Sequence, residues 1–292
     1  MYGATSPAAA IAEIDRAVHT ALAQACIQPA ELSTSVFSLA GADWPEDFKL
    51  LEATMRSRGY GHDITIVNDA MGALRAGSPD GTGVVVACGT GAAIGARHPD
   101  GRIWHSSFWQ EVQGADELGG RALRAVYRAE LGIDPATKLT ERILEAFAAR
   151  TVEEVLHRMT GREHSRPDRR QLVRALFDTA DAGDRAARRI LISHGKALGD
   201  YAIAAARKVG LLESSFWLVL TGGVLRHPSP ILRNALIERV RESAPGVQPI
   251  QSRFEPAAGA LLLALDLAHI DTDAPVLEQL EKSLPGAPFF AT

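Results

Sequence analysis

The residues best suited to chemistry follow two apolar segments, in Val67-Asn68-Asp69-Ala70 and in Cys88-Gly89-Thr90-Gly91. An aspartate directly after a strand can accept a proton from an attacking hydroxyl, and Asp69 occupies that position. Glycines allow backbone N–H groups to approach phosphate oxygens, and the hydroxyl of Thr90 can donate a further hydrogen bond. This combination suits the transfer of a phosphoryl group to a hydroxyl.

Both motifs also have an ordinary structural interpretation, which the residue pattern leaves open. Asp69 could cap a helix that begins at Ala70, because aspartate is favoured at that position. Gly89-Thr90-Gly91 could be a plain hairpin turn. A third motif, Thr221-Gly222-Gly223, either lets a flat ring or a phosphate come close or serves only as a strand-to-helix turn. None of these is a P-loop, because no Gly-Lys-Ser/Thr follows.

Two adjacent acids, Asp116 and Glu117, lie in the segment Gln113-Gly114-Ala115-Asp116-Glu117-Leu118-Gly119-Gly120. Acidic residues at the start of a helix interact favourably with its dipole, which is one interpretation. The other interpretation is that they form hydrogen bonds to the hydroxyl groups of a substrate such as a sugar. His105 and Trp109, just upstream, could line the same site. The histidines lack the spacing of metal ligands, so no metal site is expected from them.

The surrounding sequence predicts an α/β fold. Apolar residues at helical spacing predict a helix over 8–25, and short strands are expected at 35–40 and 64–67, each followed by a helix. The first of these helices begins near Trp44-Pro45, with Asp43 as its expected cap. Strand–helix alternation of this kind is typical of sheets with helices on their faces.

Later segments predict an antiparallel meander over 83–104, an almost entirely helical stretch from 116 to about 210, and a second strand–helix part over 215–268. This order suggests two lobes, with the glycine turns opening at strand ends. Ligands bind beyond such ends in open sheets.

Composition narrows the class of protein. The chain has 292 residues, of which 46% are hydrophobic, and a net charge of −4, which gives no long-range attraction to nucleic acid or to an anionic membrane. Cys26 and Cys88 are far apart and form no Cys-x-x-Cys pair. The N-terminus lacks the pattern of a signal peptide, and no apolar run reaches transmembrane length. A soluble cytoplasmic protein is expected.

Taken together and in this order, the motifs resemble the N-acetylglucosamine kinase family and its relatives, the BadF/BadG/BcrA/BcrD-type ATPases that activate benzoyl-CoA and hydroxyacyl-CoA reductases. Both groups belong to the actin-like ATPase superfamily of sugar kinases. The resemblance spans residues 8 to 268 and rests on four segments, which are Ile66-Val67-Asn68-Asp69-Ala70, Val86-Ala87-Cys88-Gly89-Thr90-Gly91, Leu220-Thr221-Gly222-Gly223-Val224 and Pro256-Ala257-Ala258-Gly259-Ala260.

The resemblance implies a two-lobed α/β fold of the ribonuclease H-like type, with an N-terminal lobe over 1–80 and a second lobe over 81–258. The second lobe would hold a helical insertion over about 115–210, and residues 259–292 would form a closing helix and tail. It also implies transfer of the ATP γ-phosphate to the 6-hydroxyl of an amino sugar, with ATP and Mg²⁺ as cofactors and a homodimer as the assembly.

Site roles follow from the same resemblance. Asp69 would be the base toward the sugar hydroxyl. The phosphate would be held by Gly89, Thr90 and Gly91, and adenosine would lie against Gly222 and Gly223. The sugar would contact Asn68, Asp116 and Glu117.

The sequence departs from the family pattern at the sugar side. The family usually has Gly-Asp-Glu-Gly-Ser there, preceded by Gly-Trp-Gly, whereas this chain has Gly114-Ala115-Asp116-Glu117-Leu118 preceded by Trp109-Gln110-Glu111. Ala92 also stands where the family often has a serine after its Gly-Thr-Gly. The particular sugar is therefore left open.

A second departure concerns the start. The family opens with a strand carrying Asp-Gly-Gly-Gly-Thr-Lys-Thr, the first phosphate loop, and no such run occurs among these 292 residues. Met1-Tyr2-Gly3-Ala4-Thr5-Ser6-Pro7 resembles the loop after the family's third strand, so about 25–40 residues are expected to be missing. Either the natural chain is longer, or this is a shortened paralogue that binds rather than catalyses.

Loss of that loop would remove a carboxylate and backbone donors from Mg–ATP, so an incomplete Mg²⁺ site and weak phosphoryl transfer are expected. It would also uncover a sheet edge that favours self-association. A third interpretation is an ATPase that activates a redox partner. Such activators usually carry cysteines for an iron–sulfur cluster, which Cys26 and Cys88 match poorly.

Overall fold

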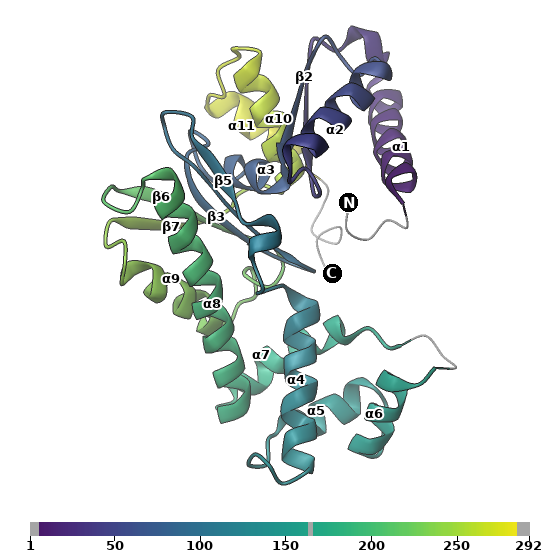
Figure 1. The fold of residues 1–292 in the computed structure, drawn as a ribbon, viewed down its shortest axis with the longest axis vertical. Helices are drawn as coiled ribbons and strands as arrows, with labels where there is room; N and C mark the ends of the chain where they lie inside the picture. Colours follow the sequence, from purple (N-terminus) through teal and green to yellow (C-terminus); the bar gives the residue numbers. More distant parts are fainter. Residues whose placement is uncertain (1–5, 163–165, 285–292) are drawn as a thin grey trace.

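Two separate β-sheets organise the chain, and helices pack around and beyond them (Figure 1). The computed structural model describes residues 6–162 and 166–284 of the 292. The first sheet has two strands, and the second has five in the order β5-β4-β3-β6-β7. Within the described residues, no helix is both long and apolar enough to cross a membrane.

The first sheet is parallel, and its strands are joined by a helical crossover. In chain order this part contains α1 (Pro7–Ala25), η1 (Pro29–Glu31), β1 (Thr34–Leu39), α2 (Pro45–Ser57) and β2 (Asp63–Asn68). Ser6 caps α1 by accepting a hydrogen bond from the backbone N–H of Ala9. A small core around Met55, Tyr60 and Ile64 joins α1 and α2 to the sheet.

The second sheet joins two chain segments, which pair side by side at its centre. Its strands are β3 (Gly83–Cys88), β4 (Ala92–Arg97), β5 (Ile103–His105), β6 (Phe216–Thr221) and β7 (Val247–Gln251). The first three form an antiparallel meander, and β6 and β7 continue the sheet in parallel beyond β3. Ala87 lies opposite Thr221, so the turns that follow β3 and β6 meet.

Helices cover both faces of this sheet, as the alternation of β3 requires. Val85 packs against α3 (Asp69–Arg75), whereas Val84 and Val86 belong to the larger core that includes α8 (Arg185–Val209). α3 is crossed closely by α10 (Pro256–Leu267). A Cβ on Gly259 would lie 1.9 Å from the carbonyl oxygen of Gly72, so only glycine allows this approach.

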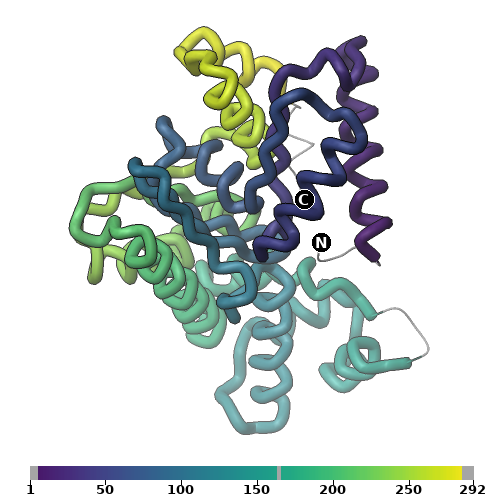
Figure 2. Tube along the Cα trace, turned by 45° about the horizontal axis from the view of Figure 1, so that its top comes forward, coloured from purple at the N-terminus to yellow at the C-terminus, as the bar shows by residue number. Residues whose placement is uncertain are grey.

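The remaining helices extend beyond the sheet or close the chain, and Figure 2 shows the first group projecting from its end. The first group comprises η2 (Ser107–Trp109), α4 (Ala115–Glu130), α5 (Leu139–Ala146), α6 (Val152–Thr160), η3 (Arg169–Gln171) and α7 (Leu172–Asp181), and α11 (Ala274–Ser283) closes the chain. α9 (Ile231–Arg241) packs instead against α8 and β7 at the second sheet. Asp184 caps the long α8, and Gly210, with φ of 87°, ends it.

An ion pair between α3 and α10 carries a prediction about stability. The buried guanidinium of Arg75 donates two hydrogen bonds to Asp266, at 2.7 and 3.0 Å. Asp266→Ala removes the anionic partner of this guanidinium and leaves only the neutral acceptors Thr272 and Ser78, so the free energy of unfolding should fall by about 2 to 3 kcal/mol in urea titrations. Glu281→Ala, which removes the exposed pair with Arg253, should cost at most about 1 kcal/mol. Equal losses would contradict the account.

Candidate active site

The junction of β2 and α3 presents Asn68 and Asp69 at the end of the first sheet. The side-chain oxygen of Asn68 accepts a hydrogen bond from the backbone N–H of Ala70 at 3.0 Å, so Asn68 is the cap of α3. Asp69 is the first residue of the helix, not its cap. The capping interpretation of Asp69 is therefore wrong, and its carboxylate stands at the strand end.

Asp43 has a different place from the predicted one. It was expected to cap α2, but the cap residue is Trp44, and its backbone N–H donates a hydrogen bond to the carboxylate of Asp47 at 2.9 Å. The Asp43 carboxylate instead accepts hydrogen bonds from Asn68 Nδ2 at 3.1 Å and from Ser107 Oγ at 2.6 Å. The loop after β1 thus reaches the segment that follows β5.

A continuous polar chain results, from Asn68 through Asp43 and Ser107 to His105. Ser107 Oγ lies 2.5 Å from His105 Nδ1. Sequence reasoning missed Asp43 and Ser107 as parts of this cluster. The sequence did contain a clue to the role of Asp43. Asp47 lies three residues after Trp44, and an acid at that spacing can accept the backbone N–H at the helix start, which leaves the Asp43 carboxylate available for other contacts.

Burial and charge set the protonation of this cluster. Burial raises the pKa of the Asp69 carboxyl above its ordinary 3.8, and the neighbouring negative charge of Asp43 raises it further. Burial lowers the pKa of His105, while Asp43 and Asp69 partly oppose that shift. A carboxylate whose proton affinity is increased in this way is a stronger base than a solvated aspartate.

Aromatic rings lie beside the carboxylates. Trp44 and Phe108 are stacked, with ring centroids 6.0 Å apart, and both are about half exposed. Trp109 is 71% exposed, and its backbone carbonyl accepts a hydrogen bond from Tyr201 at 3.1 Å. Exposed rings next to a few fixed polar groups are typical of small-molecule sites.

The turn between β3 and β4 is held from behind by the start of α4. The backbone N–H of Gly89 donates to the carbonyl of Gly91 at 2.9 Å, and that of Ala115 donates to the carbonyl of Gly89 at 2.8 Å. Gly114 packs so closely that a Cβ would lie 2.2 to 2.7 Å from the carbonyl oxygens of the turn. Thr90 and Gly91 remain exposed.

The turn after β6 abuts the first one. Gly222 has a φ of 92°, and a Cβ at this position would lie only 2.4 Å from the carbonyl oxygen of Cys88, so glycine is required here. The backbone N–H of Val224 donates to that same oxygen at 3.0 Å. A Cβ on Gly223 or Gly89 would meet nothing within 4 Å. The two turns therefore form one open, glycine-lined surface that fits the close approach of a nucleotide.

Asp116 and Glu117 make their contacts elsewhere. Asp116 is paired with Arg169 of η3, and this guanidinium holds the pKa of its carboxyl below the ordinary value. Glu117 accepts a hydrogen bond from the backbone N–H of Gln113 at 2.7 Å. In the part of the chain that the structure describes, no hydrogen bond or ion pair joins these acids to Asp69.

Metal-ligating groups are sparse around these elements. The described ranges contain no cluster of three or more His, Cys, Asp or Glu side chains able to hold a metal ion. Cys26 is exposed, whereas Cys88 is buried, and burial raises the pKa of its thiol to about 12. A thiol that stays protonated is a poor ligand for a cluster.

Comparison with solved structures defines the class of fold. The structure matches one from Chromobacterium violaceum with a TM-score of 0.55 and 21% identity, covering 83% of this chain and 80% of that one. It matches another from Porphyromonas gingivalis with a TM-score of 0.58 and 17% identity, covering 88% and 86%. Both are provisionally named N-acetylglucosamine kinases. The fold is that of the actin-like ATPases, as the resemblance implied.

Sequence comparison then gives the family. The BadF/BadG/BcrA/BcrD ATPase family matches residues 2–264, and the chain belongs to it. The N-acetyl-D-glucosamine kinase of Dictyostelium discoideum is 30% identical over 237 residues, covering 78% of this chain and 74% of that protein. The N-acetylmuramic acid/N-acetylglucosamine kinase of Clostridium acetobutylicum is 26% identical over 242 residues, covering 80% and 78%.

Proposed function

We propose that this protein transfers the γ-phosphoryl group of Mg–ATP to the 6-hydroxyl of N-acetylglucosamine or a related amino sugar. The observation that carries the proposal is the partly buried carboxylate of Asp69 at a strand end, beside Asp43, on a chain that also has two abutting glycine turns. Kinase activity on these sugars is in the names of two relatives, which supports the choice of substrate.

In the proposed reaction, Asp69 accepts the proton of the sugar hydroxyl. The hydroxyl oxygen forms a bond to the γ-phosphorus, and the bond from that phosphorus to the β-phosphate oxygen breaks, which releases ADP. Asp43 and burial keep the proton affinity of Asp69 high. Asn68 and Ser107 hold Asp43 in place through their hydrogen bonds.

The remaining roles are assigned on the same basis. The turn of Gly89, Thr90 and Gly91 would hold phosphate, with the hydroxyl of Thr90 as one donor, and Gly222 and Gly223 would lie against adenosine. Asn68, Asp116 and Glu117 would contact the sugar, which requires Asp116 to exchange its pairing with Arg169 for the ligand. A cytoplasmic homodimer is part of the same proposal.

A coupled ADP-release assay on the 292-residue chain tests the proposal. It uses Mg–ATP with and without N-acetylglucosamine, glucosamine, N-acetylmuramic acid and glucose. ADP release that depends on an amino sugar is the expected result. Release that is independent of every sugar would contradict it.

A second candidate is a protein that binds the sugar or the nucleotide without turnover. It corresponds to the alternative in which the natural chain lacks the Asp-Gly-Gly-Gly-Thr segment of the family. Saturable sugar binding in calorimetry, combined with no ADP release from a folded sample, would select it. An activator of a redox partner is disfavoured, because Cys88 is buried as a protonated thiol.

The raised pKa of Asp69 predicts the pH dependence of kcat. Only the deprotonated carboxylate can accept the proton, so kcat should fall as the pH drops through a pKa above 3.8. Asp43→Asn removes the neighbouring negative charge while keeping an oxygen acceptor for Asn68 and Ser107. The acid limb of the kcat profile should therefore move to lower pH.

His105 also titrates near this site, so the same profile is measured for His105→Gln, which cannot titrate. An acid limb of the kcat profile that persists in His105→Gln is assigned to the Asp69 carboxylate. An acid limb that is unchanged in Asp43→Asn would contradict the assignment of Asp69.

A further inference from the structure

A cleft of about 810 Å³ lies in the helical part, between α4, the loop at 134–138 and the first turn of α8. Its lining contains six basic side chains and three acidic ones. The basic residues are Arg121, Arg124, Arg128, Lys138, Arg185 and Arg189. Such an excess is unexpected in a chain whose net charge is −4.

Most of the acidic groups in the cleft are already engaged. Asp134 is paired with Arg128 at 2.7 Å. Asp184 accepts hydrogen bonds from the Thr137 hydroxyl at 3.0 Å and from the backbone N–H groups of Lys138 and Ala187, each at 2.9 Å. The third acid, Glu141, cannot balance the remaining cations.

Four of the cations make no ion pair within the described residues, although Asp134 also attracts Arg189 from a longer distance. Among residues 6–162 and 166–284, no acidic side chain lies within 4.0 Å of the charged groups of Arg124, Lys138, Arg185 or Arg189. Unpaired like charges raise the electrostatic free energy of the cleft, which an anionic ligand would lower.

The charges in the cleft also affect the pKa of Arg121. Burial lowers the pKa of the Arg121 guanidinium, and the positive charge of Arg124 lowers it further, against the opposing effect of Glu117. The N-terminus of α8 is already occupied by the carboxylate of its cap, Asp184. The attraction for an anion therefore comes from the cationic side chains.

We propose that this cleft binds a small molecule that carries two or more phosphate groups. Guanidinium groups bind phosphate through paired hydrogen bonds, and several of them converge here from two helices. The volume suits a compact ligand, and Ala125, Pro135 and Ile190 offer an apolar surface for an organic part. A long nucleic acid is disfavoured by the negative net charge of the chain.

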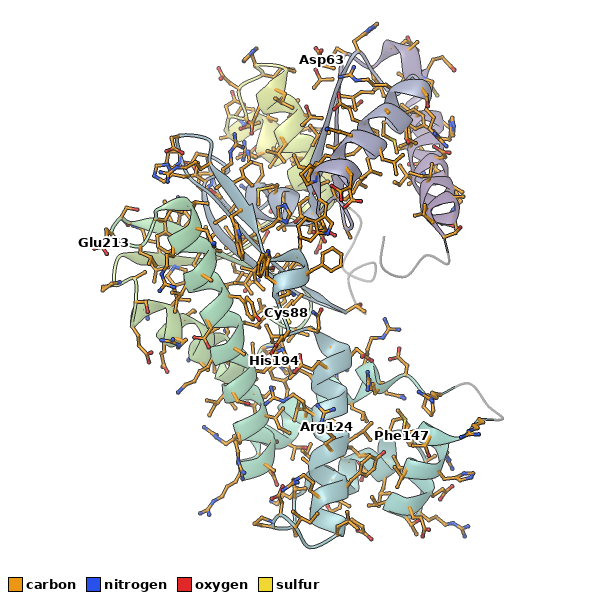
Figure 3. All side chains as sticks on the ribbon, in the orientation of Figure 1. Asp63, Cys88, Arg124, Phe147, His194 and Glu213 are labelled. Atoms are coloured by element: carbon orange, nitrogen blue, oxygen red, sulfur yellow. The ribbon has the colours of Figure 1, made fainter. Side chains whose placement is uncertain are left out.

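The site is distinct from the candidate active site. Arg124 lies along α4, away from Cys88, which marks the glycine turns at the sheet end (Figure 3). None of the residues lining the cleft belongs to the Asp69 cluster or to the two turns. The proposal therefore does not depend on the proposed kinase activity.

Calorimetric titration of the full chain with sodium tripolyphosphate, at fixed ionic strength and without nucleotide or sugar, tests the proposal. Wild type should bind saturably. Arg124→Gln/Arg189→Gln should raise the Kd about tenfold or more, because two charged hydrogen-bond donors are lost. A second pair, Lys138→Gln/Arg185→Gln, removes the other two of the four cations that make no ion pair among the described residues and should have a comparable effect.

Arg188→Gln is the matched control, because Arg188 is exposed on α8 beside Arg189 but does not line the cleft. It should leave the Kd within about twofold. Asp69→Asn should also leave it unchanged, which separates this site from the active site. A hexose bisphosphate as second titrant shows whether an organic carrier is accepted, and it should require the same arginines.

Three results would overturn the proposal. The first is no saturable binding to a wild-type chain whose circular dichroism shows it to be folded. The second is tripolyphosphate binding that persists in both double variants, since the anion would then bind elsewhere, for example at the glycine turns. The third is an equal loss in Arg188→Gln, which would show only non-specific attraction.

Discussion

Asp69→Asn is expected to lower kcat for sugar-dependent ADP release by about 10²- to 10⁴-fold, the usual contribution of a general base. The amide has nearly the same shape as the carboxylate but cannot accept the hydroxyl proton. Because Asn68 and not Asp69 caps α3, the substitution should leave the helix start intact. The Kd for ATP, measured by calorimetry, should change little.

Asp63→Asn provides the matched control, since Asp63 is an exposed carboxylate at the opposite end of the same strand β2. It should leave kcat within about twofold of wild type, because surface substitutions away from a site have small effects. A fully active Asp69→Asn, or an equal loss in Asp63→Asn, would remove Asp69 from the role of base.

Gly114→Ala is expected to lower kcat/KM for ATP by about 10²-fold. The new methyl group would lie 2.2 to 2.7 Å from the carbonyl oxygens of Gly89, Thr90 and Gly91. Backbone atoms cannot rotate away as a flexible side chain can, so the turn itself must move. Displacement of a phosphate-binding group by about 1 Å is sufficient for a loss of this size.

Gly120→Ala controls for the introduction of alanine into the same region. It lies within α4, and the atoms nearest to an added Cβ are the ends of the Arg169 and Arg124 side chains, which can move. Alanine is also favoured over glycine inside a helix. Normal ATP kinetics in Gly120→Ala with a loss in Gly114→Ala is expected; normal kinetics in both would contradict the proposed role of the turn.

Much of the fold could be predicted because local signals agreed with the final structure. The strand expected at 64–67 became β2, and the meander expected over 83–104 became β3 to β5. Period-2 and helical patterns, together with glycine and proline turns, carry this information in short windows. The family was also inferred from motifs in order and is confirmed by the match over residues 2–264.

The candidate site could be predicted only in part, because its cluster forms between distant segments. Asp43 and Ser107 are 64 positions apart, and only the packing of the two sheets brings them into contact. Asp116 was expected to face a sugar, yet in the structure it pairs with Arg169, a partner 53 positions away. The lobe boundaries, the homodimer, the missing first phosphate loop and the cytoplasmic location stay predictions.

The basic cleft could not have been found from the sequence. Arg124 and Arg189 belong to helices far apart in the chain, and each looks like part of a solvated helix face. Only the crossing of α4 and α8 gathers these charges around one opening. A modest net charge therefore does not exclude a strongly positive local site.

The most direct test of the central claim is a product analysis by phosphorus and proton NMR. The 292-residue chain and Asp69→Asn are each incubated with Mg–ATP and N-acetylglucosamine, and in parallel with the 6-deoxy sugar. The account predicts a phosphate ester on the 6-oxygen from wild type only, and none with the 6-deoxy sugar. Phosphate released to water, an ester at another position, or equal product from Asp69→Asn would contradict it.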